Sequence, residues 1–298
     1  MIVTTFRLPW LPEGRLIRTD RGELFVRLHR HPDPTRPVVL LLHGWTASSD
    51  LQFFTAYEAL AERFTFVGID HRGHGRGLRS PSAFTLEDAA DDAATAVRAL
   101  GLGPVVAIGY SMGGPVSLHL ARRHRDLVAG LVVQATALEW SATWRERALW
   151  RVFPIVGSWL RSRGYRRYLN RAVPKLIGAG HELEPYVPWL VSEMSRNDSF
   201  AMVDAGRALS KYDARPWASS LAVPAASLIT TEDRLVRPSK QRALAQALGA
   251  SRRELAADHL GALSHPRQFA ALTVELVGLI APQRASAVVT SSPSPDVA

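Results

Sequence analysis

The chain has 298 residues, 47% of them hydrophobic, which suits one large domain or a domain with an insertion. It contains no cysteine, and this excludes disulfides, thiolate catalysis and cysteine-based metal sites. The formal net charge is +9, from 36 basic and 27 acidic residues, but no recognised nucleic-acid-binding module accompanies it. We therefore expect no nucleic-acid partner.

The two ends of the chain carry no segment that predicts a membrane or export signal. The first ten residues lack a charged start, a long apolar run and a small-residue cleavage site. No apolar stretch reaches the ~18 residues that are needed to span a bilayer. We therefore expect a cytoplasmic protein. Residues 283–298 are rich in small and polar residues without periodicity, which predicts a disordered tail.

Strands and helices are predicted to alternate along much of the chain. Short apolar runs indicate strands, and apolar residues at helical spacing indicate helices. The expected strands are residues 23–29, 38–42, 65–70, 105–108, 127–135, 225–231 and 253–256. The expected helices are residues 51–64, 86–100, 116–121, 239–248 and 267–280. Because several of these strands are apolar on both faces, we expect an α/β fold with a mostly parallel sheet that is covered by helices on both sides.

This alternation breaks between residues 138 and 221, where helical patterns with many tryptophans occur and no strand is convincing. We interpret residues 138–221 as a helical cap that is inserted over the edge of the sheet. The core is then expected in two parts, residues 1–137 and 222–282.

The segment 109–113, Gly-Tyr-Ser-Met-Gly, lies between a predicted strand and a predicted helix. In such a tight strand-to-helix turn, side chains on Gly109 and Gly113 would collide with neighbouring backbone, and Ser111 is raised to the rim as a nucleophile. The first amides of the helix lack intrahelical partners and face the place where an oxyanion would sit. The alternative is a loop serine in a nucleotide-binding turn, but no Gly-x-Gly-x-x-Gly follows a strand.

A serine hydroxyl is a poor nucleophile at neutral pH and needs a base that an acid orients. Asp233, which directly follows a predicted strand, is the best candidate for the acid, and Glu232 is its alternative. His259 is the best candidate for the base, and His265 is its alternative. The order Ser, Asp, His is the one expected after such a turn. The histidines show no metal-ligand spacing, so we expect neither a metal nor another cofactor.

Together these motifs resemble the α/β-hydrolase fold superfamily, in its serine hydrolase branch with a His-Gly-x motif and a helical cap. The matching blocks, in order and each after a predicted strand, are His-Gly-Trp at 43–45, Asp-His-Arg-Gly-His-Gly at 70–75, residues 109–113, residues 233–238, and His259 with Pro266. Two positions depart from the family pattern. Asp258 stands where glycine usually precedes the catalytic histidine, and Gly77 stands where serine is usual.

The resemblance implies a catalytic triad of Ser111, Asp233 and His259, with an oxyanion hole formed by the backbone N–H groups of Trp45 and Met112. It implies a serine hydrolase, carboxylesterase-like or lipase-like, that cleaves an ester or related acyl compound with a sizeable apolar part. The same triad would also serve a cofactor-free haloperoxidase or perhydrolase, a C–C bond hydrolase, a lactonase or an acyltransferase. The alternative from another class is a non-catalytic lipid- or ligand-binding protein with this fold.

Three other residues in these blocks are expected to have structural roles. His43 is expected to hold the oxyanion loop through hydrogen bonds, and Asp70 and Arg72 are expected to brace their own loop.

The predicted cap contains many arginines between residues 145 and 171, against the single acid Glu146, with aromatic and aliphatic residues between them. We favour an ordinary cap with its apolar residues toward the active site and its arginines toward water. The alternative is a basic amphipathic lid that makes weak contact with an anionic membrane. Both interpretations predict an apolar pocket above Ser111.

Overall fold

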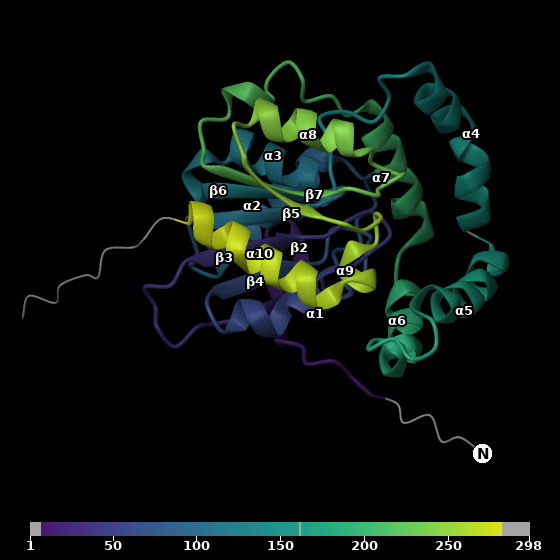
Figure 1. The fold of residues 1–298 in the computed structure, drawn as a ribbon, viewed down its shortest axis with the longest axis horizontal. Helices are drawn as coiled ribbons and strands as arrows, with labels where there is room; N and C mark the ends of the chain where they lie inside the picture. Colours follow the sequence, from purple (N-terminus) through teal and green to yellow (C-terminus); the bar gives the residue numbers. More distant parts are fainter. Residues whose placement is uncertain (1–6, 161, 282–298) are drawn as a thin grey trace, which may run out of the picture.

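Figure 1 shows the computed structural model of the chain, which describes residues 7–160 and 162–281. Within these residues an 8-stranded sheet has the order β1-β2-β4-β3-β5-β6-β7-β8. The strands are β1 (Glu13–Thr19), β2 (Gly22–His29), β3 (Val38–Leu42), β4 (Thr65–Ile69), β5 (Val105–Tyr110), β6 (Val128–Gln134), β7 (Ala225–Thr230) and β8 (Ser251–Leu255). The predicted tail, residues 283–298, lies outside the described residues.

Helices cover both faces of the sheet. The helices of the described residues are α1 (Ser49–Ala61), α2 (Leu86–Ala99), α3 (Gly113–Arg123), α4 (Trp144–Leu160), α5 (Arg163–Ile177), α6 (Val187–Met194), α7 (Ser199–Lys211), α8 (Pro238–Ala247), α9 (Gly261–Ser264) and α10 (Pro266–Ile280). Leu40 of β3 packs in the layer with α2, α3 and α8, whereas its neighbour Leu41 packs in the layer with α1 and α10. Because both faces are buried, β3 is an unbroken apolar run.

The predicted α/β fold with a mostly parallel sheet is confirmed, and most strand and helix boundaries differ from the predicted ones by only a few residues. The antiparallel part lies at one edge, where β1 pairs with β2 and β2 pairs with β4. The edge strand β1 was not predicted. Its sequence is charged and its side chains are mostly exposed, so it lacks the apolar signal of a buried strand.

Helices α4 to α7 lie between β6 and β7 in the chain, and in Figure 1 they stand along one side of the core with α4 and α5 outermost. Helix α7 packs against α4 and α2, and α6 packs against α5 and α1. The segment 138–221 is called the cap below, and its boundaries stay a prediction. Among the described residues, none of the helices is both long and apolar enough to cross a membrane.

Candidate active site

The turn between β5 and α3 holds Ser111 in an unusual backbone conformation. Its φ is +51°, in the left-handed region that residues with a Cβ rarely adopt. A Cβ on Gly109 would collide with the backbone of Gly113, and a Cβ on Gly113 would collide with the carbonyl of Leu42. The Ser111 N–H donates to the Gln134 carbonyl at 2.9 Å, which fixes the strained residue to β6. The predicted need for both glycines is confirmed.

The structure brings Ser111, His259 and Asp233 together in one hydrogen-bonded chain. Ser111 Oγ lies 3.0 Å from His259 Nε2, and His259 Nδ1 lies 2.7 Å from Asp233 Oδ2. The three side chains follow β5, β8 and β7, because the carboxyl ends of parallel strands meet at one edge of the sheet. With Nδ1–H donated to the carboxylate, Nε2 is left to accept the serine proton.

The Asp233 carboxylate is buried and held by several donors. Its Oδ1 accepts the backbone N–H groups of Leu235 and Val236, both at 2.8 Å. Its Oδ2 accepts the Thr230 hydroxyl at 3.0 Å and the Gln241 amide at 3.2 Å, in addition to His259. These bonds fix the plane of the carboxylate and so the direction of the histidine ring.

The two alternative residues lie elsewhere. The side chain of Glu232 is exposed, while its neighbour Asp233 is only 2% exposed. His265 is also exposed, directly precedes α10, and has its Nδ1 3.0 Å from Ser264 Oγ. Asp233 and His259 are therefore the pair that reaches Ser111.

The loop that contains Trp45, whose backbone N–H is a predicted oxyanion donor, is held by hydrogen bonds of His43 and of the Trp45 side chain. His43 Nε2 accepts the backbone N–H of His71 at 2.9 Å, and its Nδ1 donates to the Gly44 carbonyl at 2.8 Å. The indole Nε1–H of Trp45 donates to the carbonyl of Met202 in α7. The expected role of His43 in holding this loop is confirmed, and the oxyanion hole of Trp45 and Met112 stays a prediction.

The loop after β4 is braced as expected. Asp70 accepts the backbone N–H groups of Ser49 and Arg76, each at 2.8 Å. Arg72 donates twice to Asp92 of α2, with both distances 2.8 Å. Burial raises the pKa of Asp70 to about 7.

Asn197, between α6 and α7, joins the cap to both loops, and sequence reasoning missed it. Its Nδ2–H donates to the Thr46 carbonyl at 2.7 Å, and its Oδ1 accepts the Gly75 N–H at 2.8 Å. Thr46 has a φ of +61°, so the loop that contains Trp45 is strained at the residue that Asn197 holds. The only signal in the sequence is an Asn-Asp-Ser start of a helix, which does not reveal what Asn197 touches.

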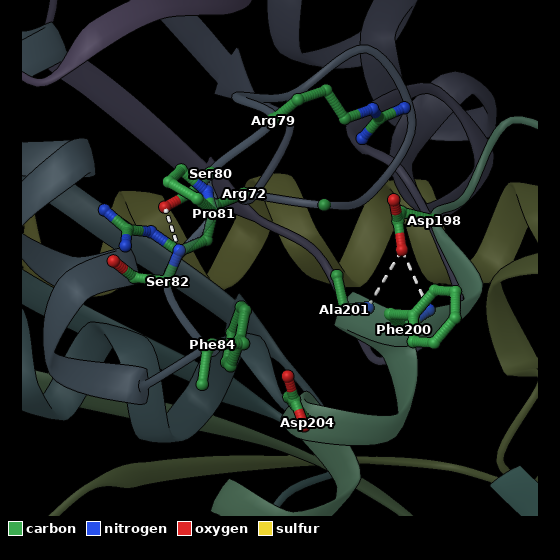
Figure 2. Close-up of a pocket in the computed structure, with 12 residues that line it drawn as sticks. Arg72, Arg79, Ser80, Pro81, Ser82, Phe84, Asp198, Phe200, Ala201 and Asp204 are labelled. Atoms are coloured by element: carbon green, nitrogen blue, oxygen red, sulfur yellow. Dashed lines mark hydrogen bonds between the residues drawn. The ribbon is translucent and has the colours of Figure 1, made fainter.

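Asp198, the residue after Asn197, caps α7 by accepting hydrogen bonds from the N–H groups of Phe200 and Ala201 (Figure 2). A cavity of about 150 Å³ separates α7 from the loop of residues 72–84. No triad residue is among those that line it. The cavity in Figure 2 is therefore distinct from the cavity at Ser111, which is described next.

A second cavity, of about 120 Å³, opens directly on Ser111 and His259. Its other lining residues, mostly apolar, are Gly44, Trp45, Thr46, Ala47, Leu51, Gln52, Tyr110, Met194, Leu260, Ala262 and Leu263. The predicted apolar pocket above Ser111 is thus present. Ligand pockets usually measure ~300–1,000 Å³, so this cavity is small for a ligand site.

Three buried histidines, His43, His71 and His74, lie close together in the loops after β3 and β4. The ring centroids of His43 and His71 are 4.2 Å apart, and those of His43 and His74 are 5.5 Å apart. Within the described part of the chain, neither ring nitrogen of His71 has a hydrogen-bond partner. Burial lowers the pKa of His43 well below its usual value, that of His71 to about 3 and that of His74 to about 4.

We expect these histidines to make the protein less stable as the pH falls from 7 to 5. Their pKa values are depressed in the folded state, so only the unfolded chain takes up their protons in this range. Asp70 acts in the opposite direction, because its raised pKa makes the folded chain the better proton acceptor, but it is one group against three. Urea unfolding at pH 7 and pH 5 measures the loss. The loss should be smaller in His71→Leu, and an equal loss in that variant would contradict the assignment.

Comparisons with known proteins agree with this fold. The family model "alpha/beta hydrolase fold" matches residues 37–155. The 2-(acetamidomethylene)succinate hydrolase of Mesorhizobium japonicum is 34% identical over 115 residues, 39% of this chain and 40% of that protein. The bifunctional esterase/perhydrolase of Acinetobacter calcoaceticus is 38% identical over 98 residues, 33% of this chain and 36% of that protein. The match thus spans about two fifths or less of the length of each of these relatives.

A solved structure extends the likeness beyond the matched segment. The enol-lactonase of Burkholderia xenovorans LB400 superposes with a TM-score of 0.75 at 22% identity, over 89% of this chain and 100% of that chain. This coverage takes in far more of the fold than the family model, which ends at residue 155 and so before Asp233 and His259. The eight-stranded sheet, the strained serine turn and the family model matched over residues 37–155 agree, and the chain has the α/β-hydrolase fold.

Proposed function

We propose that this protein is a serine hydrolase that cleaves an ester or a related acyl compound through an acyl-enzyme at Ser111. The observation that carries the proposal is the continuous chain from Ser111 through His259 to Asp233, at 3.0 and 2.7 Å. The serine sits at the end of a strand in a strained turn, where its hydroxyl borders the compact cavity. The hydrolase and esterase names of the two relatives support the same chemistry.

In the proposed reaction His259 Nε2 takes the proton of Ser111 Oγ as the oxygen attacks the substrate carbonyl. Asp233 stabilises the imidazolium that forms. The backbone N–H groups of Trp45 and Met112 bind the oxyanion, and His259 then protonates the leaving group. Water, activated by the same histidine, releases the acyl group from Ser111. No cofactor enters these steps.

The small cavity places a constraint on the substrate. An acyl group inside about 120 Å³ must be compact, so a sizeable apolar part belongs on the leaving-group side. Perhydrolase, haloperoxidase, C–C hydrolase, lactonase and acyltransferase reactions remain alternatives on the same triad, since they differ in the pocket and not in the triad. A binding protein without catalysis needs no aligned serine, histidine and aspartate, which disfavours that alternative.

The cytoplasmic location of the protein and a weak contact of the cap with an anionic membrane stay predictions. The second is supported by the exposed aromatic side chains Trp144, Trp159 and Tyr168 on α4 and α5, and by Arg151 and Arg167, which are exposed on the same two helices. Exposed aromatic rings and cations on such helices suit the interface of an anionic bilayer.

Labelling with a fluorophosphonate, followed by peptide mapping, tests the proposed function. We expect the label on Ser111 and its loss in Ser111→Ala. Ser264 offers a matched control, because its hydroxyl also lies 3.0 Å from a histidine nitrogen, that of His265, on the surface of the protein. Ser264→Ala should label like the unchanged protein. A folded protein that takes no label at Ser111 would rule out the activated serine.

A further inference from the structure

Gln52, in the first turns of α1, faces the nucleophile from the wall of the small cavity. A Cβ added to Gly44 would lie 3.2 Å from Gln52 Oε1 and also 3.2 Å from Ser111 Cβ. The amide of Gln52 and the side chain of Ser111 therefore lie near each other above Gly44. A substrate acyl group bound to Ser111 would lie within reach of this amide.

Four other polar side chains of the cavity are already engaged. Tyr110 Oη donates to the His259 carbonyl at 2.8 Å, Trp45 Nε1 donates to the Met202 carbonyl, and Ser111 and His259 bind each other. The Gln52 amide, by contrast, has no hydrogen-bond partner among residues 7–160 and 162–281, although it is half-buried. An amide that borders the cavity and is not paired within the protein is free to form hydrogen bonds with a bound ligand.

We propose that Gln52 determines specificity by binding a hydrogen-bonding group that the substrate carries next to its scissile carbonyl. An amide both donates and accepts, so it suits a carbamoyl or an α-hydroxyacyl group. The apolar remainder of the wall and the volume of about 120 Å³ restrict this acyl group to a few heavy atoms. The acyl part of the substrate is therefore compact and polar, whereas its leaving group carries the apolar part. This inference rests on the proposed function.

Two esters that differ in one atom of the acyl group test the role of Gln52. The p-nitrophenyl esters of glycolic acid and propionic acid have acyl groups of the same size, but only the first carries a hydroxyl next to the carbonyl. In Gln52→Met the side chain keeps its length and loses the amide. We expect the ratio of kcat/KM for glycolate over propionate to fall by about tenfold or more in this variant. The intrinsic reactivity of each ester cancels, because the same pair is compared in both enzymes.

Further variants separate the amide from the shape of the cavity. Gln52→Leu, which removes the amide with a different shape, should lower the ratio in the same direction. Met194→Leu changes another lining residue and should leave the ratio within about twofold, because it removes no hydrogen bond. An unchanged ratio in both Gln52 variants would overturn the proposal.

The proposal and the proposed function fail in different ways. If Ser111 takes the fluorophosphonate and propionate is hydrolysed, but the ratio does not respond to Gln52, only the role of Gln52 is wrong. If Ser111 takes no label and neither ester is hydrolysed, the proposed function itself is wrong.

Discussion

Replacing Asp233 with Asn is expected to lower kcat by about four orders of magnitude with the fold retained. The reason lies in how the carboxylate is held. Oδ1 accepts two backbone N–H groups, those of Leu235 and Val236, and an amide oxygen would keep that position. The amide NH₂ of Asn would then face His259 Nδ1. His259 would then adopt the tautomer with its proton on Nε2, and that nitrogen could no longer accept the proton of Ser111.

The measurement is kcat with an activated ester, together with the rate of fluorophosphonate labelling, which should fall in parallel. Glu232→Gln is the matched control, because it removes the neighbouring charge from an exposed side chain and should leave both rates nearly unchanged. A kcat in Asp233→Asn close to that of the unchanged protein would exclude Asp233 as the acid.

Ser111, Asp233 and His259 were predictable because each depends on a short stretch of sequence. The turn at Ser111 needs only the strand before it, the helix after it and the two glycines. Asp233 and His259 each follow a strand, and the carboxyl ends of parallel strands lie at the same edge of a sheet. The positions of the strands in the sequence are therefore enough to predict that these residues come together. The buried strands of the fold were predictable for the same reason, because each is a short apolar run in the sequence.

Residues whose roles depend on contacts between distant segments were not predictable. Gln52 lies in a helix between Leu51 and Phe53, and its sequence position gives no sign that its amide borders a cavity. Asn197 donates a hydrogen bond to Thr46, which is 151 residues away in the chain. This contact depends on how the cap packs against the core. Side-chain packing of this kind has no periodic signature, so pattern analysis cannot detect it.

Asn197→Asp is expected to lower kcat by about 10- to 100-fold with KM changed by less than about twofold. A carboxylate oxygen would replace the Nδ2–H donor and would meet the Thr46 carbonyl at a site now spanned by a 2.7 Å hydrogen bond. Two acceptors repel each other, so the bond would be lost. Thr46 would then leave its left-handed conformation, and the adjacent N–H of Trp45, a proposed oxyanion donor, would be displaced.

Steady-state kinetics of Asn197→Asp beside Ser192→Ala, an exposed change on α6, measures this loss. A second substitution shows whether the loss runs through Thr46. Glycine adopts a φ near +61° without steric cost, so in a Thr46→Gly background the loop depends less on Asn197 for its conformation. The effect of Asn197→Asp on kcat should therefore shrink in that background. An equal loss in both backgrounds, or a loss seen only in KM, would mean that Asn197 merely attaches the cap. A smaller loss would show that a residue of the cap positions the oxyanion loop of the core.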